Sequence, residues 1–468
     1  MKAHAMRRGN HAMRRGKARG AAAIGLVAFC GCAANELPRN VVLLVVDTVR
    51  ADHLGLYGHE RPTSPRLDEW STRGVVFEQA LATSPWTVPS FASIYTGHLP
   101  SRHGAARSAQ DPGAPGVSIG RLDDGVRTLA ELLFERGFAT AAIVNNPFLH
   151  ARGGLARGFS NYDHEPGNNW NMRRADAVVD RTLRWIDQPR DTPFLIVAHL
   201  FDPHLDYDPP EPFRGRFAGD YDGGLRYPVS DLRRIRASRV AHRPEDRRFI
   251  AGAYDEELLY IDAQIGRLLD GLEERGLLDD TLIILVSDHG EEFFDHGSFE
   301  HGHSVYQELL RVPLVIWAPR ARARRVAAPV SIADVLPTIL AATGAEPEPG
   351  LYGRSLWKTV LGGDPPTERV FVAENTLRGG EQKALVRWPH KLVLDVTTGA
   401  TQLFDLVDDP GETRDLSAEN PAVRDQLLVK LHATVEAPAH GRPAQPTEFP
   451  PDTLERLREL GYLNGGGD

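Results

Sequence analysis

The chain is poor in cysteine, in excess basic charge and in long apolar runs. Its only cysteines among 468 residues, Cys30 and Cys32, lie close to the N-terminus, so the rest of the chain can form no disulfide. The net charge of −9 gives no basic footprint for nucleic acid, and we expect no such partner. Beyond residue 32 no apolar run is long enough to span a membrane. The hydrophobic fraction of 41% is that of a globular protein.

Residues 1–32 differ in composition from everything that follows. They contain many Arg and Lys residues, no acid, and then the apolar run Ala21–Cys30, a pattern typical of a signal peptide. Phe29–Cys32 is similar to a bacterial lipoprotein cleavage site, which predicts a lipid anchor at Cys32; a plain signal peptide is the alternative. A repeated hexapeptide leaves both Met1 and Met13 as candidate starts. We expect an exported protein of the bacterial cell envelope, periplasmic or outer-membrane associated, that meets the membrane only through this anchor.

Buried strands alternate with amphipathic helices along the first three quarters of the chain. Alternation of this kind predicts an α/β fold with a mainly parallel sheet covered by helices on both faces. The expected strands are Val41–Val46, Thr140–Val144, Phe194–Ala198, Leu282–Val286 and Leu314–Trp317. The expected helices are Ser64–Arg73, Pro89–Thr96, Val126–Arg136 and Asp246–Arg275, each followed by a glycine that ends it. We expect Arg214–Arg243 to be an exposed insertion.

The composition changes near Thr343–Gly350, which predicts a linker between a catalytic domain at 39–345 and a smaller subdomain at 350–468. Short strands are expected at Val370–Ala373, Lys383–Arg387, Lys391–Asp395 and Thr401–Asp405. These would form an antiparallel sheet with a helix over Ala422–Val435, giving an α+β subdomain. Pro438–Pro451 is interpreted as a loop and Leu454–Leu463 as a terminal helix.

Polar residues follow two of the predicted strands, at the edge of the sheet where functional groups gather. Asp47 ends one strand, Asp288 and His289 end another, and Thr87 opens a helix, where free N–H groups favour an anion. Two carboxylates, an imidazole and a hydroxyl are a suitable ligand set for a divalent cation. Such a metal would lower the pKa of the hydroxyl and make Thr87 a nucleophile.

Several segments resemble one protein family. Asn40–Asp47, followed by Arg50 and Asp52–Gly55, resembles the first metal-binding strand of the sulfatases, and Ser287–Glu291 resembles the second. Further resemblances lie at residues 194–210, 297–313 and 403–412. The chain is therefore identified over residues 39–463 as a member of the sulfatase family within the alkaline phosphatase superfamily. This implies an alkaline phosphatase-like three-layer sandwich.

The resemblance also implies roles for individual residues. Thr87 stands where sulfatases carry a cysteine that is oxidised to formylglycine; only Cys, or Ser in some bacteria, is converted, so we expect no formylglycine. One divalent ion, Ca, Mg, Mn or Zn, would be held by Asp47, Asp288, His289 and Thr87. The residues expected to be catalytic are Thr87, His204 and His301, and those expected to contact substrate are His103, His303 and Asn145.

Some of these roles have alternatives. His103 could instead support its loop, and His199 could orient Asp202. Asp202, His204 and His303 have the ligand types of a second metal site, and the alternative is that these histidines bind the substrate anion directly.

Three departures from the family pattern accompany the threonine. Thr48 replaces the second acid of an Asp-Asp pair, Phe91 replaces an arginine, and Asn145-Asn146-Pro147 aligns with a Lys-x-His motif. The pattern is closer to that of relatives with an unmodified nucleophile, such as phosphonate and phosphodiester hydrolases and phosphoglycerol or phosphoethanolamine transferases.

These observations predict a metal-dependent hydrolase of sulfate or phosphate esters of a small molecule, glycan or lipid. A phospho-threonine ester can be hydrolysed at phosphorus, whereas a sulfo-threonine lacks the hemiacetal escape of formylglycine, which favours phosphoryl transfer. One alternative is an inactive protein that binds sulfated or phosphorylated glycans. Another is an envelope phospho-head-group transferase, although such enzymes usually carry several N-terminal transmembrane helices.

Overall fold

The computed structural model describes residues 37–107, 118–165, 172–229, 235, 243–367, 369–435 and 445–459. The predicted signal peptide and its two cysteines lie outside these residues, as do parts of the segments 214–243, 438–451 and 454–463. Within the described ranges, no helix is long and apolar enough to cross a membrane.

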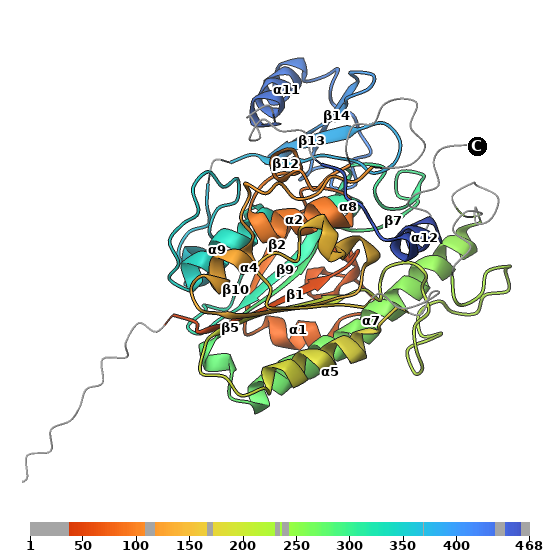
Figure 1. Ribbon diagram of the computed structural model, residues 1–468. Coiled ribbons are helices and arrows are strands. Elements are labelled where there is room, and N and C mark those ends of the chain that lie inside the picture. The colour runs from red at the N-terminus through yellow and green to blue at the C-terminus, as the bar shows by residue number, and fades with distance from the viewer. Residues whose placement is uncertain are drawn as a thin grey trace, which may run out of the picture. The chain divides into compact units, whose positions relative to one another are not determined.

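A nine-stranded sheet forms the centre of the fold, in the order β10-β2-β9-β6-β1-β5-β3-β4, with β11 beside β2 (Figure 1). Strand β1 (Asn40–Val46) pairs in parallel with β5 (Phe194–Leu200) and with β6 (Thr281–Ser287). Strands β3 (Ala139–Val144) and β4 (Asn161–His164) continue the parallel part beyond β5. Every residue of β1 is buried, as expected of an apolar run that forms the centre of a parallel sheet.

The other side of the sheet includes antiparallel pairs. Strand β9 (Arg311–Trp317) runs antiparallel to both β6 and β2 (Val75–Leu81). Two short strands, β10 (Arg324–Val326) and β11 (Val330–Ser331), pair in parallel with β2. The sheet is therefore mainly parallel, as predicted, but β2 was not among the predicted strands.

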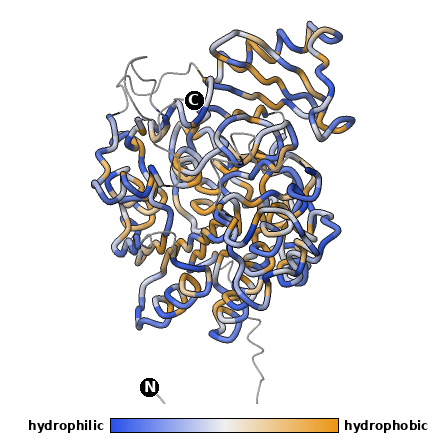
Figure 2. The backbone as a smooth tube through the Cα atoms, turned by 90° about the vertical axis from the view of Figure 1, so that its right-hand side faces the viewer, coloured by the Kyte–Doolittle hydropathy of each residue, from blue (hydrophilic) through white to orange (hydrophobic). Residues whose placement is uncertain are grey.

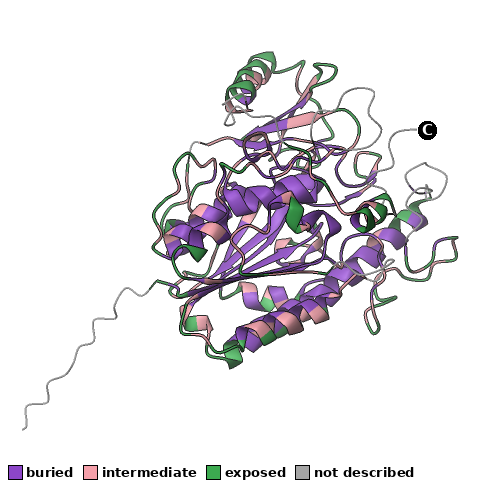
Figure 3. Ribbon diagram, viewed as in Figure 1, coloured by how far each residue is buried: buried purple, intermediate pink, exposed green. Residues whose placement is uncertain are grey.

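Helices cover both faces of the sheet (Figure 1). One face is packed by α1 (Pro65–Ser71), α5 (Ala175–Ile186) and α7 (Pro244–Glu274), against alternate β1 residues that include Val42 and Leu44. The opposite face is packed by α2 (Thr87–Thr96), α4 (Leu129–Phe134) and α9 (Val335–Ala342), against Val41, Leu43 and Val45. Successive side chains of a strand point to opposite faces, so β1 joins both cores. The predicted three-layer sandwich is confirmed, with the strands buried between the helices (Figure 3).

Short elements lie in the connections. These are the helices α3 (Pro100–His103), α8 (Gln307–Leu310), α10 (Trp357–Val360) and α12 (Pro451–Glu459), the strands β7 (Glu292–Phe293) and β8 (Phe299–Glu300), and 3₁₀ turns η1 (Ala51–His53), η2 (Gly55–Tyr57), η3 (Pro147–Leu149), η4 (Ala151–Gly153), η5 (Leu278–Asp280) and η6 (Ile332–Asp334).

The C-terminal part contains a four-stranded antiparallel sheet, as predicted. Its strands are β12 (Phe371–Ala373), β13 (Gln382–Arg387), β14 (His390–Asp395) and β15 (Thr401–Asp405), in that order. Helix α11 (Pro421–Val435) packs Leu427 and Leu431 onto this sheet. Figure 2 shows the mixture of hydrophobic and hydrophilic residues along these strands that suits a sheet with one face packed against a helix.

A buried ion pair attaches this sheet to the larger part. Lys391 Nζ lies 2.6 Å from Glu412 Oε1, and both side chains are fully buried. The other oxygen of Glu412 accepts a hydrogen bond from the backbone N–H of Gln307 at the start of α8, at 2.6 Å. Its backbone carbonyl is 3.3 Å from His296 Nε2. Glu412 is the last residue of the family-like segment 403–412 noted above, so this end of the segment has a structural role.

The described part of the predicted insertion, up to residue 229, is not wholly exposed. The backbone N–H groups of Phe217 and Ala218 donate to Glu256 on α7, and Leu225 and Val229 are buried. The expectation of an exposed segment is therefore confirmed only in part: most of its described residues are exposed or partly exposed, but Leu225 and Val229 pack into the core beside the long helix.

Candidate metal centre and active site

The ends of two adjacent strands bring three predicted ligands together. Because β1 and β6 pair with Val46 opposite Ser287, the next residues, Asp47 and Asp288, emerge side by side. His289 Nε2 lies 3.6 Å from Asp47 Oδ1 and 3.4 Å from Asp288 Oδ2. One ligand atom from each of the three residues lies within 4.8 Å of the other two, and all three side chains are fully buried.

The polar atoms of this group are suited to a cation. Asp47 Oδ1 and Asp288 Oδ2 are buried and accept no hydrogen bond. Burying a carboxylate oxygen without a partner is costly, and a cation between the two would satisfy both. Carboxylate oxygens with an imidazole nitrogen admit Ca, Mg, Mn or Zn.

The electrostatics agree with this fit. Burial, and then the charge of Asp47, raise the pKa of Asp288 well above its usual range. Burial acts in the same direction on Asp47, but the hydrogen bond from His199 and the nearby histidines outweigh it and lower the pKa of Asp47 to about 2. Burial lowers the pKa of His289 to about 4, which favours the neutral ring that a metal requires.

Neighbouring backbone groups orient the three ligands. His289 Nδ1 is 2.9 Å from the carbonyl of Gly290, so its N–H donates there and the Nε2 lone pair faces the carboxylates. Asp288 Oδ1 accepts from the backbone N–H groups of Thr48 and His289, at 3.3 and 2.9 Å. A Cβ on Gly290 would stand 2.0 Å from the carbonyl oxygen of Glu308, which explains the glycine after Asp-His.

Thr87 joins the group from the first turn of α2. Its Oγ1 is 3.4 Å from His289 Nε2, and the residue is 1% exposed. The preceding residue, Trp86, donates its indole N–H to the carbonyl of Asn375 at 2.6 Å and so fixes the start of the helix. The free N–H groups of this turn favour a bound anion next to the hydroxyl.

Asn146 is a site residue that the sequence analysis missed. Its Nδ2 donates to Asp47 Oδ2 at 3.0 Å and to Thr87 Oγ1 at 3.3 Å, so one amide nitrogen contacts both a ligand and the hydroxyl. Asn145, which was predicted to contact substrate, turns its Nδ2 to the backbone carbonyls of Arg173 and His199. The sequence feature that could have pointed to Asn146 is the alignment of Asn145-Asn146-Pro147 with a Lys-x-His motif.

His199 contacts Asp47 and not Asp202, so the predicted role of orienting Asp202 was wrong. Its Nδ1 accepts from the N–H of Asn145 at 3.5 Å, which leaves Nε2–H to donate to Asp47 Oδ2 at 3.2 Å. The ring of Phe91, at the position of the missing arginine, packs edge-on against His199 at 5.0 Å. Asp202 instead accepts from the N–H of Ala175 at the start of α5, and burial raises the pKa of Asp202 to about 7.

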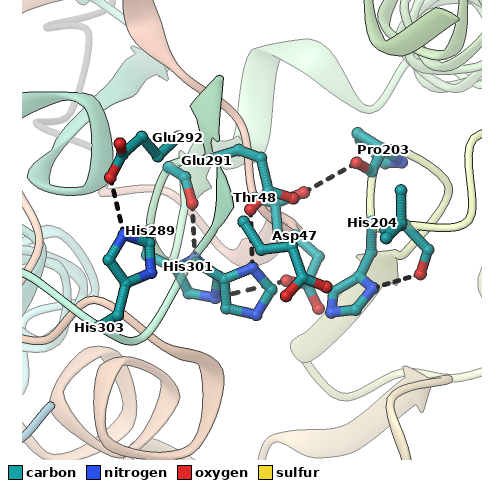
Figure 4. A network of polar contacts seen from close by, with 12 residues as sticks. Asp47, Thr48, Pro203, His204, His289, Glu291, Glu292, His301 and His303 are labelled. Atoms are coloured by element: carbon teal, nitrogen blue, oxygen red, sulfur yellow. Dashed lines mark hydrogen bonds and ion pairs between the residues drawn. The ribbon is translucent and has the colours of Figure 1, made fainter. Parts of the chain in front are cut away.

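Two of the predicted histidines, His204 and His301, lie beside the candidate metal ligands (Figure 4). The ring centroid of His301 is 4.5 Å from that of His289 and 5.0 Å from that of His204. His301 Nδ1 is 2.9 Å from Glu291 Oε1, and His204 Nδ1 is 2.8 Å from the carbonyl of Leu205. Both histidines are buried, and burial lowers the pKa of His204.

The other two histidines have different surroundings. His303 Nε2 pairs with Glu292 Oε2 at 2.7 Å, next to the cluster in Figure 4. His103 is fully buried near α2, where its Nε2 is 3.2 Å from Ser93 Oγ and 3.1 Å from the carbonyl of Pro89. These contacts favour the alternative that His103 supports its loop.

The residues considered for a second metal site, Asp202, His204 and His303, do not come together as a ligand group in the described part of the chain. A different set of described residues does have the spacing of a metal site. That set consists of His53, His59 and Asp255, and Arg61 donates to the same carboxylate at 2.7 Å. His53 Nδ1 and His59 Nε2 lie 2.6 and 3.2 Å from the Asp255 oxygens. The guanidinium and the two rings therefore satisfy Asp255 without a metal.

Comparison with known proteins identifies the family of the chain. The sequence pattern of the Sulfatase family matches residues 39–345, which is more than half of the chain. The chain belongs to the sulfatase family. It is 26% identical to the arylsulfatase of Clostridium perfringens over 81% of this chain and 90% of that protein. It is also 26% identical to human arylsulfatase A, over 90% and 92% of the two chains.

Solved structures show the same fold. The phosphonate monoester hydrolase of Agrobacterium radiobacter superimposes with a TM-score of 0.69 at 23% identity, over 85% of this chain and 96% of that one. The predictions of a sulfatase-family chain, of its fold and of a hydrolase of sulfuric or phosphoric esters are confirmed at this level.

Proposed function

We propose that the protein is a metal-dependent hydrolase of phosphate esters that uses the unmodified Thr87 hydroxyl as nucleophile. The observation that carries this proposal is the position of Thr87 Oγ1. It lies in the first turn of α2, 3.4 Å from His289 Nε2, and accepts the amide N–H of Asn146. A hydroxyl in such surroundings has the neighbours that activate a nucleophile.

Asp47, Asp288 and His289 would hold the metal, with Thr87 completing the set. A bound divalent ion would lower the pKa of the hydroxyl and withdraw charge from the transferred group. Asn146 then donates to the Thr87 oxygen as negative charge develops there, and its second contact keeps Asp47 turned toward the ligand group. His199 donates to the same carboxylate and supports that orientation.

The reaction has two displacements on phosphorus. In the first, the Thr87 hydroxyl releases its proton to solvent, a bond forms between Thr87 Oγ1 and phosphorus, the ester bond breaks, and the departing alcohol takes a proton from a histidine. In the second, water attacks phosphorus and gives a proton to that histidine, and the Thr87 oxygen leaves and takes a proton back from solvent. His204 and His301 are the candidate proton carriers because their rings lie together beside His289.

Phosphate esters are favoured over sulfate esters because a threonine has no hemiacetal route for releasing a sulfate. Sulfate esters must also be tested as substrates because of what the similar proteins are named. Several are arylsulfatases, and one solved neighbour was determined with a disulfated glucosamine. We propose a glycan, a lipid or a small molecule as the carrier of the ester. We also propose export to the bacterial envelope and lipidation at Cys32, from the composition of residues 1–32.

Trapping the covalent intermediate tests the proposal. The purified protein is loaded with Ca, Mg, Mn or Zn and incubated with aryl phosphates, aryl phosphodiesters and aryl sulfates. It is then quenched in acid and digested for mass spectrometry. We expect a phospho adduct on Thr87 that is absent from Thr87→Ala, and accurate mass separates it from a sulfo adduct.

Three other outcomes would contradict parts of the proposal. A sulfo adduct would show that the enzyme is a sulfatase in its chemistry. Turnover by Thr87→Ala at the wild-type rate would remove Thr87 from the mechanism. If the metal-loaded protein cleaves none of these esters but binds sulfated or phosphorylated glycans, the protein is an inactive glycan-binding protein and not a hydrolase.

A further inference from the structure

A buried carboxylate lies behind His301. Glu291 Oε1 is 2.9 Å from His301 Nδ1, and Glu291 Oε2 accepts the hydroxyl of Tyr207 at 3.1 Å. Tyr207 and Glu291 are fully buried, and His301 is 1% exposed. The three side chains form a line from the interior to the histidine cluster, with one carboxylate shared between a phenol and an imidazole (Figure 4 shows Glu291 and His301).

The residues around this line are closely packed. Glu291 follows Gly290, which cannot carry a side chain because of the Glu308 carbonyl, and its own carbonyl accepts from Arg50 at 3.2 Å. The ring of Tyr207 packs edge-on against Tyr254 at 5.6 Å. A carboxylate fixed on both sides in this way can hold an imidazole in one orientation.

The orientation of His301 follows from the contact with Glu291. Because Nδ1 is turned to the carboxylate, Nε2 points in a different direction, and the rings of His289 and His204 lie within 5.0 Å of the His301 ring. The contact with Glu291 at Nδ1 and the contact of Glu291 with Tyr207 therefore fix the orientation of the His301 ring beside the ligand group.

We propose that Glu291, fixed by Tyr207, is a positioning residue that holds His301 with Nε2 toward the leaving-group oxygen, so that His301 protonates the departing alcohol. The inference rests on the proposed ester hydrolysis. The proton moves from His301 Nε2 to the ester oxygen as the bond from that oxygen to phosphorus breaks. The attacking water of the second displacement returns a proton to the same nitrogen.

Leaving-group dependence distinguishes this role from a structural one. A p-nitrophenolate leaves readily without a proton, whereas an alkoxide does not, so misplacing the acid harms only the poor leaving group. We expect Glu291→Gln to lower kcat on an alkyl phosphate by about 10²-fold, and to lower kcat on p-nitrophenyl phosphate by about threefold or less. The KM of each substrate should change little.

Two further variants and a control accompany this experiment. Tyr207→Phe removes one of the two contacts of Glu291 and should show a smaller leaving-group dependence in the same sense. Glu291→Asp keeps the carboxylate and should recover part of the loss. Glu256→Gln is the matched control: Glu256 is also a buried glutamate that accepts a tyrosine hydroxyl, from Tyr227 at 2.6 Å, but it lies on α7. Its kcat ratio between the two substrates should equal that of the wild type.

The outcomes separate this inference from the proposed function. If wild-type protein cleaves none of the esters, the proposed function fails and this inference fails with it. If the wild type is active and Glu291→Gln loses the same factor on both esters, or binds less metal per chain, Glu291 supports the fold or the ligands and the inference is overturned. If Glu291→Gln does not fold, Tyr207→Phe gives the same test, and the absence of any leaving-group dependence would overturn the inference.

Discussion

At the scale of single residues, the contacts of Asn146 are the feature with the clearest chemical consequence. One amide nitrogen lies within hydrogen-bond distance of the Asp47 carboxylate, a proposed metal ligand, and of the Thr87 hydroxyl. Removing it with Asn146→Ala should lower kcat by about 10- to 100-fold, since hydrogen bonds to charged groups are worth about 1.5–3 kcal/mol. Steady-state kinetics on the best substrate of the wild type measures this change.

The metal content of Asn146→Ala serves as the control. A variant that retains one metal per chain and loses kcat shows that the amide acts on the nucleophile. If kcat were unchanged, the contact with Thr87 would have no part in catalysis.

Substitutions of Asp288 and Asp202 are expected to have different effects on metal binding. Asp288→Asn removes a carboxylate from the ligand group, and a missing charged ligand weakens metal binding strongly. The number of metal ions per chain, measured after gel filtration, should therefore fall from about one to about a tenth of that. Asp202→Asn is the matched control, because this residue lies against α5, and should leave the metal content unchanged. Loss of metal from Asp202→Asn would restore the idea of a second site at that residue.

Most of the site could be predicted from the sequence because its residues follow apolar strands. Asp47, Asp288 and His289 stand directly after β1 and β6, and the parallel pairing of those strands brings them together. The choice between Asn145 and Asn146 could not be made, because neighbouring residues after a strand point in different directions. His199 was assigned to Asp202 from closeness in sequence, whereas the pairing of β1 with β5 brings it to Asp47.

At the scale of elements, the pair Lys391–Glu412 connects the C-terminal sheet to α8. Lys391→Met should destabilise the protein by about 3–5 kcal/mol, because it leaves a buried carboxylate without its partner. Urea unfolding followed by circular dichroism measures the loss. In the double variant Lys391→Met with Glu412→Leu the unpaired charge is gone, so most of the stability should return; an equal or larger loss would show that the Glu412 contact with Gln307 is the more important one.

A second connection between elements depends on pH. Burial lowers the pKa of His296, but the hydrogen bond and charge of Glu308 outweigh it and raise the pKa to about 9. A raised pKa in the folded state means that the pair stabilises the protein fully below about pH 6.5, the value for an unfolded histidine, and loses this effect as the pH rises toward 9. The unfolding free energy of wild type minus that of His296→Asn should therefore shrink between these values. A constant difference would contradict the assignment.

Element prediction was accurate for most of the strands, including those of the C-terminal sheet, but it missed β2. β1 and β6 were predicted from unbroken apolar residues. β2 was missed because Glu78 and Gln79 interrupt the apolar residues of Val75–Leu81. The antiparallel direction of β9 could not be predicted, because the hydropathy of a strand is the same in either direction.

At the scale of the whole molecule, metal binding should be coupled to folding. The ligands come from separated parts of the chain, so the unfolded chain does not present them together. Saturation at about 100 times the dissociation constant should stabilise the protein by about 2.7 kcal/mol. Differential scanning calorimetry of chelated and reloaded protein should show a rise in Tm with metal, and Asp288→Asn should show none. An equal rise in Asp288→Asn would place the stabilising ion elsewhere.

The position of β1 has a consequence for the order in which the protein acquires its structure. Its seven buried residues lie at the start of the described chain, but their partners in the sheet begin at residues 194 and 281. During synthesis, the edge of this strand that pairs with β5 stays unpaired until residue 194 and those after it are made. The edge that pairs with β6 stays unpaired until residue 281 is reached, when more than half of the chain has been made. Long-range pairing of this kind slows folding, and an exposed apolar strand is prone to aggregate in the meantime. We infer that the yield of soluble protein depends on chaperones that shield β1, and that slowing translation ahead of residue 281 would lower it.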